Sequence, residues 1–111
     1  MPKNPHVDYG LDGVEIIGNG SGSHHELRKL NTRLDLIRNA SARNGGVYLY
    51  SNLKGCDGNR VYFDGASIIC MNGEIYGQLP QFSIAQVETK LGVLDLDVVR
   101  SKRGAFTSRG L

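Results

Sequence analysis

The stretch GVEIIGNGSGSHHELRKLNTRLDLI, residues 13–37, decides the fold of this chain. Residues 13–17 form a short β-branched run between glycine-containing segments, which predicts a buried strand. From Leu27 onward, apolar residues recur at the spacing of an amphipathic helix with one buried stripe. The charged side chains of this segment, Arg33 among them, are expected mostly on the opposite face. The stripe is expected to contain Leu27, Leu30, Leu34 and Ile37.

Signals for both ends of this helix flank the apolar run. Ser23 and Glu26 have the spacing of a capping box, in which the serine side chain and the glutamate side chain each bind the other residue's amide. Asn44 and Gly45 can take the left-handed conformation that ends a helix. Residues 47–52, VYLYSN, then predict a second strand. A strand, a helix of about 20 residues and a strand predict a βαβ unit with parallel strands.

The remaining chain favours turns and antiparallel strands. Residues 54–60, KGCDGNR, have the composition of a turn. Residues 61–78 predict three strands, with Asn72 and Gly73 as a hairpin turn. Residues 88–99 end in an acidic helix start, and the polar end of the chain is expected to fray. The predicted fold class is a mixed α/β sheet, with one βαβ unit followed by antiparallel hairpin strands.

Charge and composition argue against several classes of partner. The chain has 111 residues, and its 13 basic and 11 acidic side chains leave a net charge of +2. These charges are scattered, which disfavours binding to nucleic acid or to an anionic membrane. No apolar run reaches the roughly 18 residues of a membrane helix, and the polar start is not a signal peptide. We therefore expect a soluble, cytoplasmic protein.

Two local features suggest a dinucleotide-binding loop and a metal site, but the spacing of their residues supports neither. Gly18, Gly20 and Gly22 follow the pattern GxGxG rather than GxGxxG, so a structural turn is favoured over a dinucleotide-binding loop. His24 and His25 are adjacent, so on a helix their side chains diverge by about 100° and share one metal ion poorly. The sequence therefore predicts no metal site.

The two cysteines are expected to be reduced thiols, because they form no CxxC pair and are too few for a disulfide framework. Cys56 is the tempting nucleophile, since Lys54 could supply positive charge beside it, but an ordinary loop thiol is favoured. Cys70 lies in an apolar run and is expected in the core.

Four motifs, taken together, resemble a known family. In combination they resemble the amidase domain of eukaryotic-type glutamine-dependent NAD⁺ synthetases, a member of the nitrilase superfamily of carbon-nitrogen hydrolases. The resemblance extends from about Pro5 to Arg103. The motifs are SGSHHELRK (21–29), KGCDG (54–58), FDGASII (63–69) and NGEIYGQ (72–78).

The resemblance implies a partial nitrilase-type α-β-β-α sandwich that takes part in releasing ammonia from glutamine. In this family, a separate synthetase domain uses ATP, Mg²⁺ and the ammonia to amidate nicotinic acid adenine dinucleotide. A cysteine attacks the carboxamide, a glutamate relays protons and a lysine stabilises the oxyanion. These three groups precede the matched stretch, so no catalytic residue is carried over. We expect residues 1–111 to be the C-terminal half of the amidase domain, inactive alone and binding no cofactor itself.

Two residues are carried over from the resemblance as glutamine-binding residues. Ser23 matches a serine that helps to hold glutamine, and Lys29 matches a basic position that contacts the same ligand. A helix N-terminus and a cation near it suit the α-carboxylate, although lysine lacks the two-pronged geometry of arginine. The expected partners are glutamine, the synthetase domain and further copies of the chain in a homo-oligomer.

Two other functions stay open at this point. The chain could be a non-catalytic short paralogue that binds the full-length enzyme or glutamine. It could also be a stand-alone nucleotide-binding βαβ protein, which rests on the glycine run alone.

Overall fold

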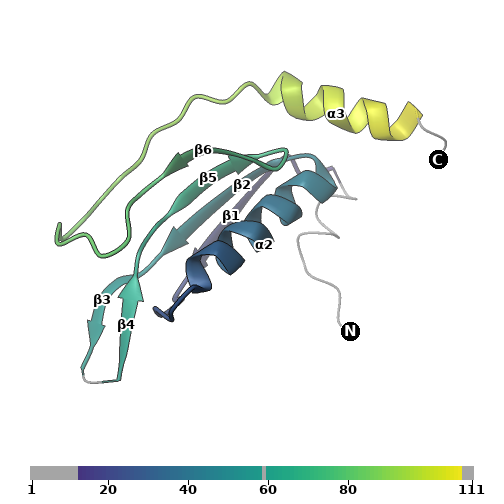
Figure 1. Ribbon diagram of the computed structural model, residues 1–111. Coiled ribbons are helices and arrows are strands. Elements are labelled where there is room, and N and C mark those ends of the chain that lie inside the picture. The colour runs from purple at the N-terminus through teal and green to yellow at the C-terminus, as the bar shows by residue number, and fades with distance from the viewer. Residues whose placement is uncertain (1–12, 59, 109–111) are drawn as a thin grey trace.

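The computed structural model describes residues 13–58 and 60–108, which form a mixed α/β fold (Figure 1). A four-stranded sheet has the strand order β1-β2-β5-β6, and β3 and β4 form a separate two-stranded hairpin. Helix α2 covers one face of the sheet, and α3 packs against the other. The elements are β1 (Ile16–Ser21), α2 (Lys29–Asn44), β2 (Val47–Asn52), β3 (Lys54–Asp57), β4 (Val61–Asp64), β5 (Ile68–Met71), β6 (Glu74–Gln78) and α3 (Leu96–Ser108).

The strand pairing confirms the predicted fold class. β1 and β2 run parallel and are joined by α2, as expected for the βαβ unit. β5 pairs antiparallel with β2 and with β6. Asn72 and Gly73 connect β5 to β6 with φ angles of 51° and 86°, which fits a type I′ hairpin turn. The second strand has the predicted bounds, 47–52.

The first strand runs further than residues 13–17, so the predicted glycine turn is wrong. Gly18 and Gly20 lie inside β1, where they pair with Leu49 and Ser51 of β2. Because β2 offers six consecutive partners, pairing extends through residues that have low strand propensity by themselves. The polar segment after β1 therefore begins at the carboxyl edge of the sheet.

The helix begins later than predicted, and the capping box is absent. α2 begins at Lys29, after Arg28 in a left-handed conformation (φ 65°), and no side chain caps its first turn. The preceding residues are held against β4 instead. His24 forms a β-bridge with Phe63, and the amide of the next residue donates to the Tyr62 carbonyl over 2.7 Å. These long-range bonds keep the segment extended, so the helix can start only after it.

The buried face of α2 also differs from the prediction. Leu27 precedes the helix and is 88% exposed, whereas Ile37 is buried as predicted. Arg33, predicted on the exposed side, is only 6% exposed. Together with Ala40 and Ser41, these two buried residues follow the spacing of one helix face. The charge at position 33 is tolerated there because a buried carboxylate lies opposite it, as described below.

Two further segments correct the sequence interpretation. Residues 54–60 hold a strand, because β3 pairs antiparallel with β4 and places Cys56 opposite Tyr62. The resulting hairpin projects from one end of the sheet (Figure 1). The polar stretch after Val99 is helical as far as Ser108, and the expected fraying of the chain end stays a prediction. Residues 109–111, like the start of the resemblance before residue 13, lie outside the described residues.

Two apolar clusters hold the helices to the sheet. Cys70 is fully buried, as predicted, and packs on the α2 side with Ile37, Tyr50 and Ile68. On the α3 side, Val99 is fully buried against the strands, in a cluster whose other buried members are Val47 and Met71. α2 therefore covers one face of the sheet, whereas α3, joined by the long segment after β6, contacts the other face through Val99.

We expect Val99→Ala to lower the free energy of unfolding by about 2 kcal/mol, since two buried methyl groups are lost and a cavity remains. Urea unfolding followed by circular dichroism measures the change. Val98→Ala is the matched control, because Val98 is 45% exposed and its truncation should change stability by about 0.5 kcal/mol or less. Equal effects of the two variants would show that α3 does not pack on the sheet in this orientation.

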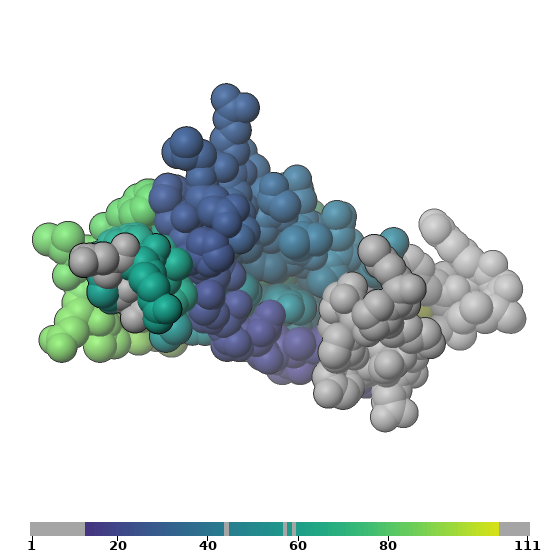
Figure 2. All heavy atoms as spheres, turned by 90° about the horizontal axis from the view of Figure 1, so that it is seen from below, coloured from purple at the N-terminus to yellow at the C-terminus, as the bar shows by residue number. Residues whose placement is uncertain are grey.

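Within the described part of the chain, neither helix is long and apolar enough to cross a lipid bilayer. Viewed from below, the molecule shows β1 at its surface (Figure 2, purple). Among the described residues, no strand pairs with the outer edge of β1.

Candidate functional site

The candidate site lies where the two parallel strands end. β1 ends at Ser21 and β2 at Asn52, and these two residues are register partners. The carboxyl edge of parallel strands is the usual place for a ligand in α/β sheets. Ser23 follows β1 directly, so the topology brings it beside the end of β2.

Asn52 clamps the main chain of Ser23 from both sides. The Ser23 amide donates to Asn52 Oδ1 over 2.8 Å, and Asn52 Nδ2 donates to the Ser23 carbonyl over 3.1 Å. The same Nδ2 lies 2.9 Å from the Gly65 carbonyl oxygen and 3.2 Å from Asp64 Oδ1. One side chain therefore joins the loop after β1 to the end of β4.

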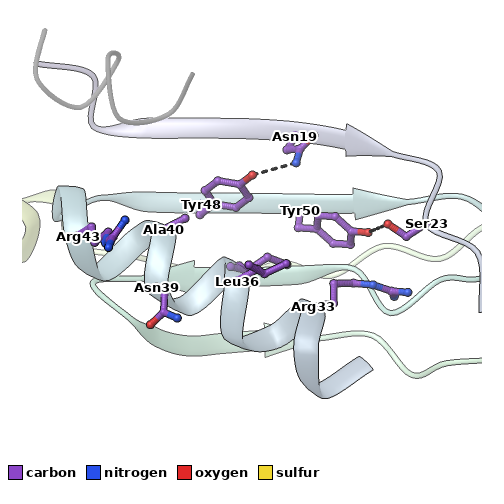
Figure 3. A pocket seen from close by; sticks show the side chains of 10 residues that line it. Asn19, Ser23, Arg33, Leu36, Asn39, Ala40, Arg43, Tyr48 and Tyr50 are labelled. Carbon is purple, nitrogen blue, oxygen red and sulfur yellow. Dashed lines mark hydrogen bonds between the residues drawn. The ribbon is translucent and has the colours of Figure 1, made fainter. Parts of the chain in front are cut away.

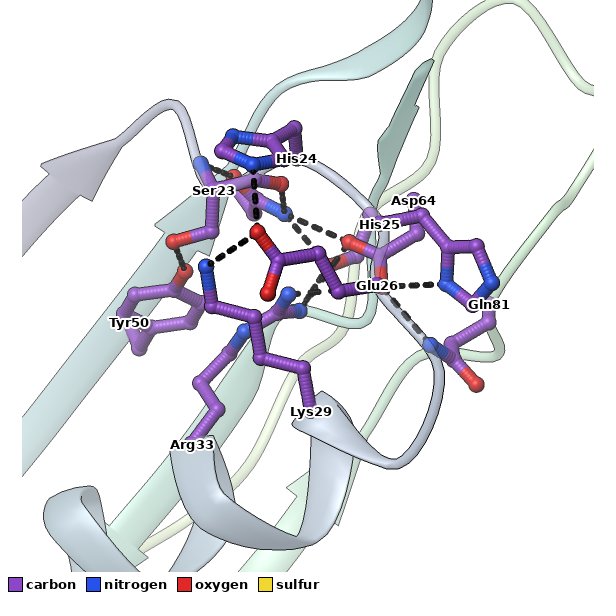
Figure 4. A network of polar contacts seen from close by, with 11 residues as sticks. Ser23, His24, His25, Glu26, Lys29, Arg33, Tyr50, Asp64 and Gln81 are labelled. Atoms are coloured by element: carbon purple, nitrogen blue, oxygen red, sulfur yellow. Dashed lines mark hydrogen bonds and ion pairs between the residues drawn. The ribbon is translucent and has the colours of Figure 1, made fainter. Parts of the chain in front are cut away.

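Arg33 and Asp64 form a buried ion pair, and Asn52 contacts its carboxylate (Figure 4). Arg33 Nη1 lies 3.1 Å from Asp64 Oδ1, and Nη2 donates to Oδ2 over 3.3 Å. Gln81 Nε2 donates to the same Oδ2 over 2.7 Å. Asp64 is 1% exposed, so the carboxylate is shielded from water and held by three neighbours: Arg33, Asn52 and Gln81.

The environment of Asp64 keeps it ionised. Burial alone would raise the pKa of Asp64, but hydrogen bonds from Arg33 and Gln81 and the Arg33 charge outweigh it, so the pKa lies below its ordinary value. The His25 ring lies nearby, with Nδ1 3.7 Å from Asp64 Oδ2 and the ring edge-on to Phe82. The network is therefore a rigid, charged support on which the Ser23 loop rests.

A second, exposed cluster surrounds Lys29. Its ammonium lies 3.6 Å from Glu26 Oε1, and His24 Nε2 lies 2.8 Å from the same oxygen. The hydrogen bond with His24, followed by the charge of Lys29, lowers the pKa of the Glu26 carboxyl. The Lys29 side chain rises toward the loop that carries Glu26 and Ser23 (Figure 4). The Glu26 carboxylate already lies beside the Lys29 ammonium, so the space next to this ammonium can hold a carboxylate group.

A groove of about 710 Å³ opens beside α2 and the ends of β1 and β2 (Figure 3). Ser23 lies in its wall, next to the hydroxyl of Tyr50, and Asn19 Nδ2 donates to the Tyr48 hydroxyl over 2.9 Å further along. Lys29 stands outside the lining. The lining residues are Asn19, Ser23, Arg33, Leu36, Ile37, Asn39, Ala40, Arg43, Tyr48 and Tyr50.

The other candidates from the sequence are not brought into one site. His24 pairs with Glu26 and His25 turns toward Asp64, so the two rings serve different networks. Lys54 pairs with Glu88 over 3.1 Å, and Cys56 is exposed on β3. Across residues 13–58 and 60–108, no three His, Cys, Asp or Glu side chains gather closely enough to hold a metal ion.

Sequence reasoning missed the residues that hold Ser23 in place. Asn52 is a polar residue at the carboxyl end of a predicted parallel strand, and this position alone could have indicated a role at the site. Asp64 belongs to the FDGASII motif but carried no assigned role. Arg33 gave no signal of its own, because a charged residue on an amphipathic helix is usually solvated.

A mixed sheet with α2 on one face, α3 against the other and a polar loop at the carboxyl ends of its parallel strands defines an α/β domain. The chain belongs to the carbon-nitrogen hydrolase family, whose model matches residues 1–103. This finding confirms the superfamily that the motifs indicated.

Sequence and structure comparisons agree on this assignment. The chain is 59% identical over 110 residues to the glutamine-dependent NAD(+) synthetase of Saccharomyces cerevisiae, covering 99% of this chain and 15% of that protein. The glutamine-dependent NAD(+) synthetase from Cytophaga hutchinsonii has 30% identity and a TM-score of 0.65 over 67% of this chain and 13% of its own. A carbon-nitrogen hydrolase from Helicobacter pylori G27 has 19% identity and a TM-score of 0.69, over 92% and 39% of the two chains, which supports the fold.

The chain thus spans about 15–16% of the length of the curated relatives that it matches. These relatives are enzymes, so the family is enzymatic. Their matched segment is a small part of a much longer protein, so the chemistry of the whole enzyme does not follow from this chain alone.

Proposed function

We propose that the chain forms part of the glutamine amidohydrolase domain of a glutamine-dependent NAD⁺ synthetase. That domain releases ammonia from glutamine, and a synthetase domain that uses ATP and Mg²⁺ consumes it to amidate nicotinic acid adenine dinucleotide. The observation that carries the proposal is the clamped Ser23 loop, within the SGSHHELRK motif, at the carboxyl edge of the sheet. The 59% identity to the Saccharomyces protein supports the substrate class.

In this proposal Ser23 and Lys29 bind the α-carboxylate of glutamine. The serine hydroxyl donates a hydrogen bond, and the lysine ammonium supplies the charge that Glu26 now attracts at 3.6 Å. Because Glu26 is exposed and lies outside the buried network, a bound carboxylate can take its place beside Lys29 without breaking that network. The ligand therefore meets a rigid serine and an adaptable lysine.

Neither of the two cysteines of this chain is proposed as the catalytic nucleophile. Among the described residues, Cys70 Sγ is buried 3.1 Å from Ser41 Oγ, and Cys56 is exposed on β3 and is not among the residues that line the groove. We therefore assign neither as the nucleophile. The cysteine, glutamate and lysine that the resemblance implies are placed elsewhere in the amidase domain, of which residues 1–111 are one part, so this chain alone should not turn over glutamine.

We also propose a cellular compartment and an oligomeric state for the protein. The compartment is proposed to be the cytoplasm. A homo-oligomer is proposed because the open edge of β1 and exposed apolar side chains such as Leu91 and Val93 favour association. ATP and Mg²⁺ are assigned to the synthetase domain, not to this chain.

The test is a chimaera in which this chain replaces the segment that it matches in the Saccharomyces relative. Ser23→Ala should raise the KM for glutamine about tenfold, because a hydrogen bond to a charged ligand is lost. Ammonia release against glutamine concentration measures it. Ser101→Ala on α3 is the matched control and should leave KM unchanged. An unaltered KM in Ser23→Ala, in a chimaera that turns over, would refute the assigned glutamine site.

A further inference from the structure

The side chain that touches the Ser23 hydroxyl comes from the sheet and not from the loop. Tyr50 lies on β2 and is 5% exposed, packed in the α2-side cluster with Ile37 and Cys70. The Arg33 guanidinium stands over its ring, 6.0 Å from the centroid. The ring is thereby held in the core, which restricts the position of its hydroxyl.

From that position the Tyr50 hydroxyl donates to Ser23 Oγ over 2.6 Å (Figures 3 and 4). Among the described residues, the other hydroxyl near Ser23 Oγ is that of Ser21 at 3.3 Å, which is long for a bond between two hydroxyls. A serine hydroxyl has one hydrogen to donate and two lone pairs to accept with. With one lone pair engaged by Tyr50, the Ser23 hydrogen is left for another acceptor.

We propose that Tyr50 is a positioning residue that fixes the Ser23 hydroxyl as a hydrogen-bond donor and so selects a ligand with a carboxylate at this point. The inference rests on the proposed function, because it takes glutamine as the ligand of Ser23. Asn52 fixes the main chain of Ser23, and Tyr50 fixes the direction of its side chain. Neither Asn52 nor Tyr50 belongs to the loop that carries Ser23.

The test uses the same chimaera with the Tyr50→Phe variant, which keeps the buried ring and removes the hydroxyl. The KM for glutamine should rise about fivefold while kcat changes less than about twofold, since one oriented hydrogen bond is weakened and the reacting carboxamide is untouched. Tyr76→Phe on β6 is the matched control, because Tyr76 is 47% exposed and outside the site. It should leave both constants unchanged.

Two measurements show whether Tyr50 orients the Ser23 hydroxyl or only stabilises the fold. In a double-mutant cycle, adding Tyr50→Phe to Ser23→Ala should raise KM by less than about twofold, because Tyr50 acts through the serine. The second measurement uses glutamine α-amide, an analogue in which an uncharged amide replaces the α-carboxylate. Preference for glutamine over this amide, as the ratio of kcat/KM values, should fall about fivefold in Tyr50→Phe.

The possible results distinguish the role of Tyr50 from the assigned glutamine site. Additive effects of the two substitutions, an unchanged preference between glutamine and its α-amide, or a fall in kcat at constant KM would each overturn the role of Tyr50. If Ser23→Ala raises the KM for glutamine and Tyr50→Phe does not, this inference fails and the proposed function stands. If Ser23→Ala itself leaves KM unchanged, the assigned glutamine site fails, and the role of Tyr50 fails with it.

Discussion

Replacing Asp64 with alanine is expected to lower the free energy of unfolding by about 3–5 kcal/mol, the usual cost of leaving one partner of a buried ion pair unpaired. Arg33, 6% exposed, would keep its charge without the carboxylate that lies 3.1 Å away. Asn52 and Gln81 would each lose an acceptor. Urea unfolding of the chain at neutral pH measures the loss.

The double variant Arg33→Met/Asp64→Leu is the informative control. Removing both charges together and filling the space with apolar side chains should recover most of the lost stability, because no unpaired charge stays buried. If the double variant were as unstable as Asp64→Ala, the cost would come from lost packing and not from the ion pair.

The same pair gives the stability a defined pH dependence. The pKa of Asp64 is lowered in the folded chain from its ordinary 3.8, so its contribution is fully present above that value and is lost as pH falls through the lower folded value. Asp64→Ala should lack this acid-dependent component. An unchanged acid unfolding profile in Asp64→Ala would contradict the assigned pairing.

Gly73→Ala is expected to lower the free energy of unfolding by about 2–4 kcal/mol, for two reasons that add. Gly73 has a φ of 86°, where a Cβ atom costs about 1–2 kcal/mol. That Cβ would also stand 2.9 Å from the Cβ of Ala42 on α2, so helix and hairpin turn would have to separate. Thermal and urea unfolding measure the effect.

Two other glycines separate the two causes. Gly58 has a φ of 56° with open space around it, so Gly58→Ala should show the conformational cost alone, about 1–2 kcal/mol. Gly104 lies in α3 with nothing within 4 Å, so Gly104→Ala should stabilise by about 0.5–1 kcal/mol. If Gly73→Ala cost no more than Gly58→Ala, the close approach to Ala42 would not matter.

The sequence was sufficient for the elements whose signals are local. VYLYSN has strand-forming residues at every apolar position, and the strand was predicted with its bounds. Asn72-Gly73 is a hairpin signal because both residues tolerate positive φ, and both adopt it. Gly45 ends α2 in the left-handed conformation for the same reason. In each case the residues that determine the structure are neighbours in the chain.

The start of α2 could not be predicted because distant residues decide it. Ser23 and Glu26 have the spacing of a capping box, yet Asn52 binds the Ser23 main chain and the Tyr62 carbonyl binds the His25 amide. Arg33 was assigned to the solvated face for a similar reason, since its partner Asp64 is 31 residues away. Ser23 and Lys29 came from the resemblance and stay a prediction, whereas the residues that hold the Ser23 loop in place came from the structure.

The clamp on Ser23 also sets an order of events during synthesis of the chain. Asn52 emerges 29 residues after Ser23, and Asp64 emerges 31 residues after Arg33. The last partner, Gln81, follows Asp64 by a further 17 residues. Until Asn52 and β4 have been made, the Ser23 loop has only local partners, and its capping-box sequence favours a longer helix. The growing chain can thus begin with a helix turn that must unwind when β4 arrives, which would delay the ordering of the site until most of the domain has been made.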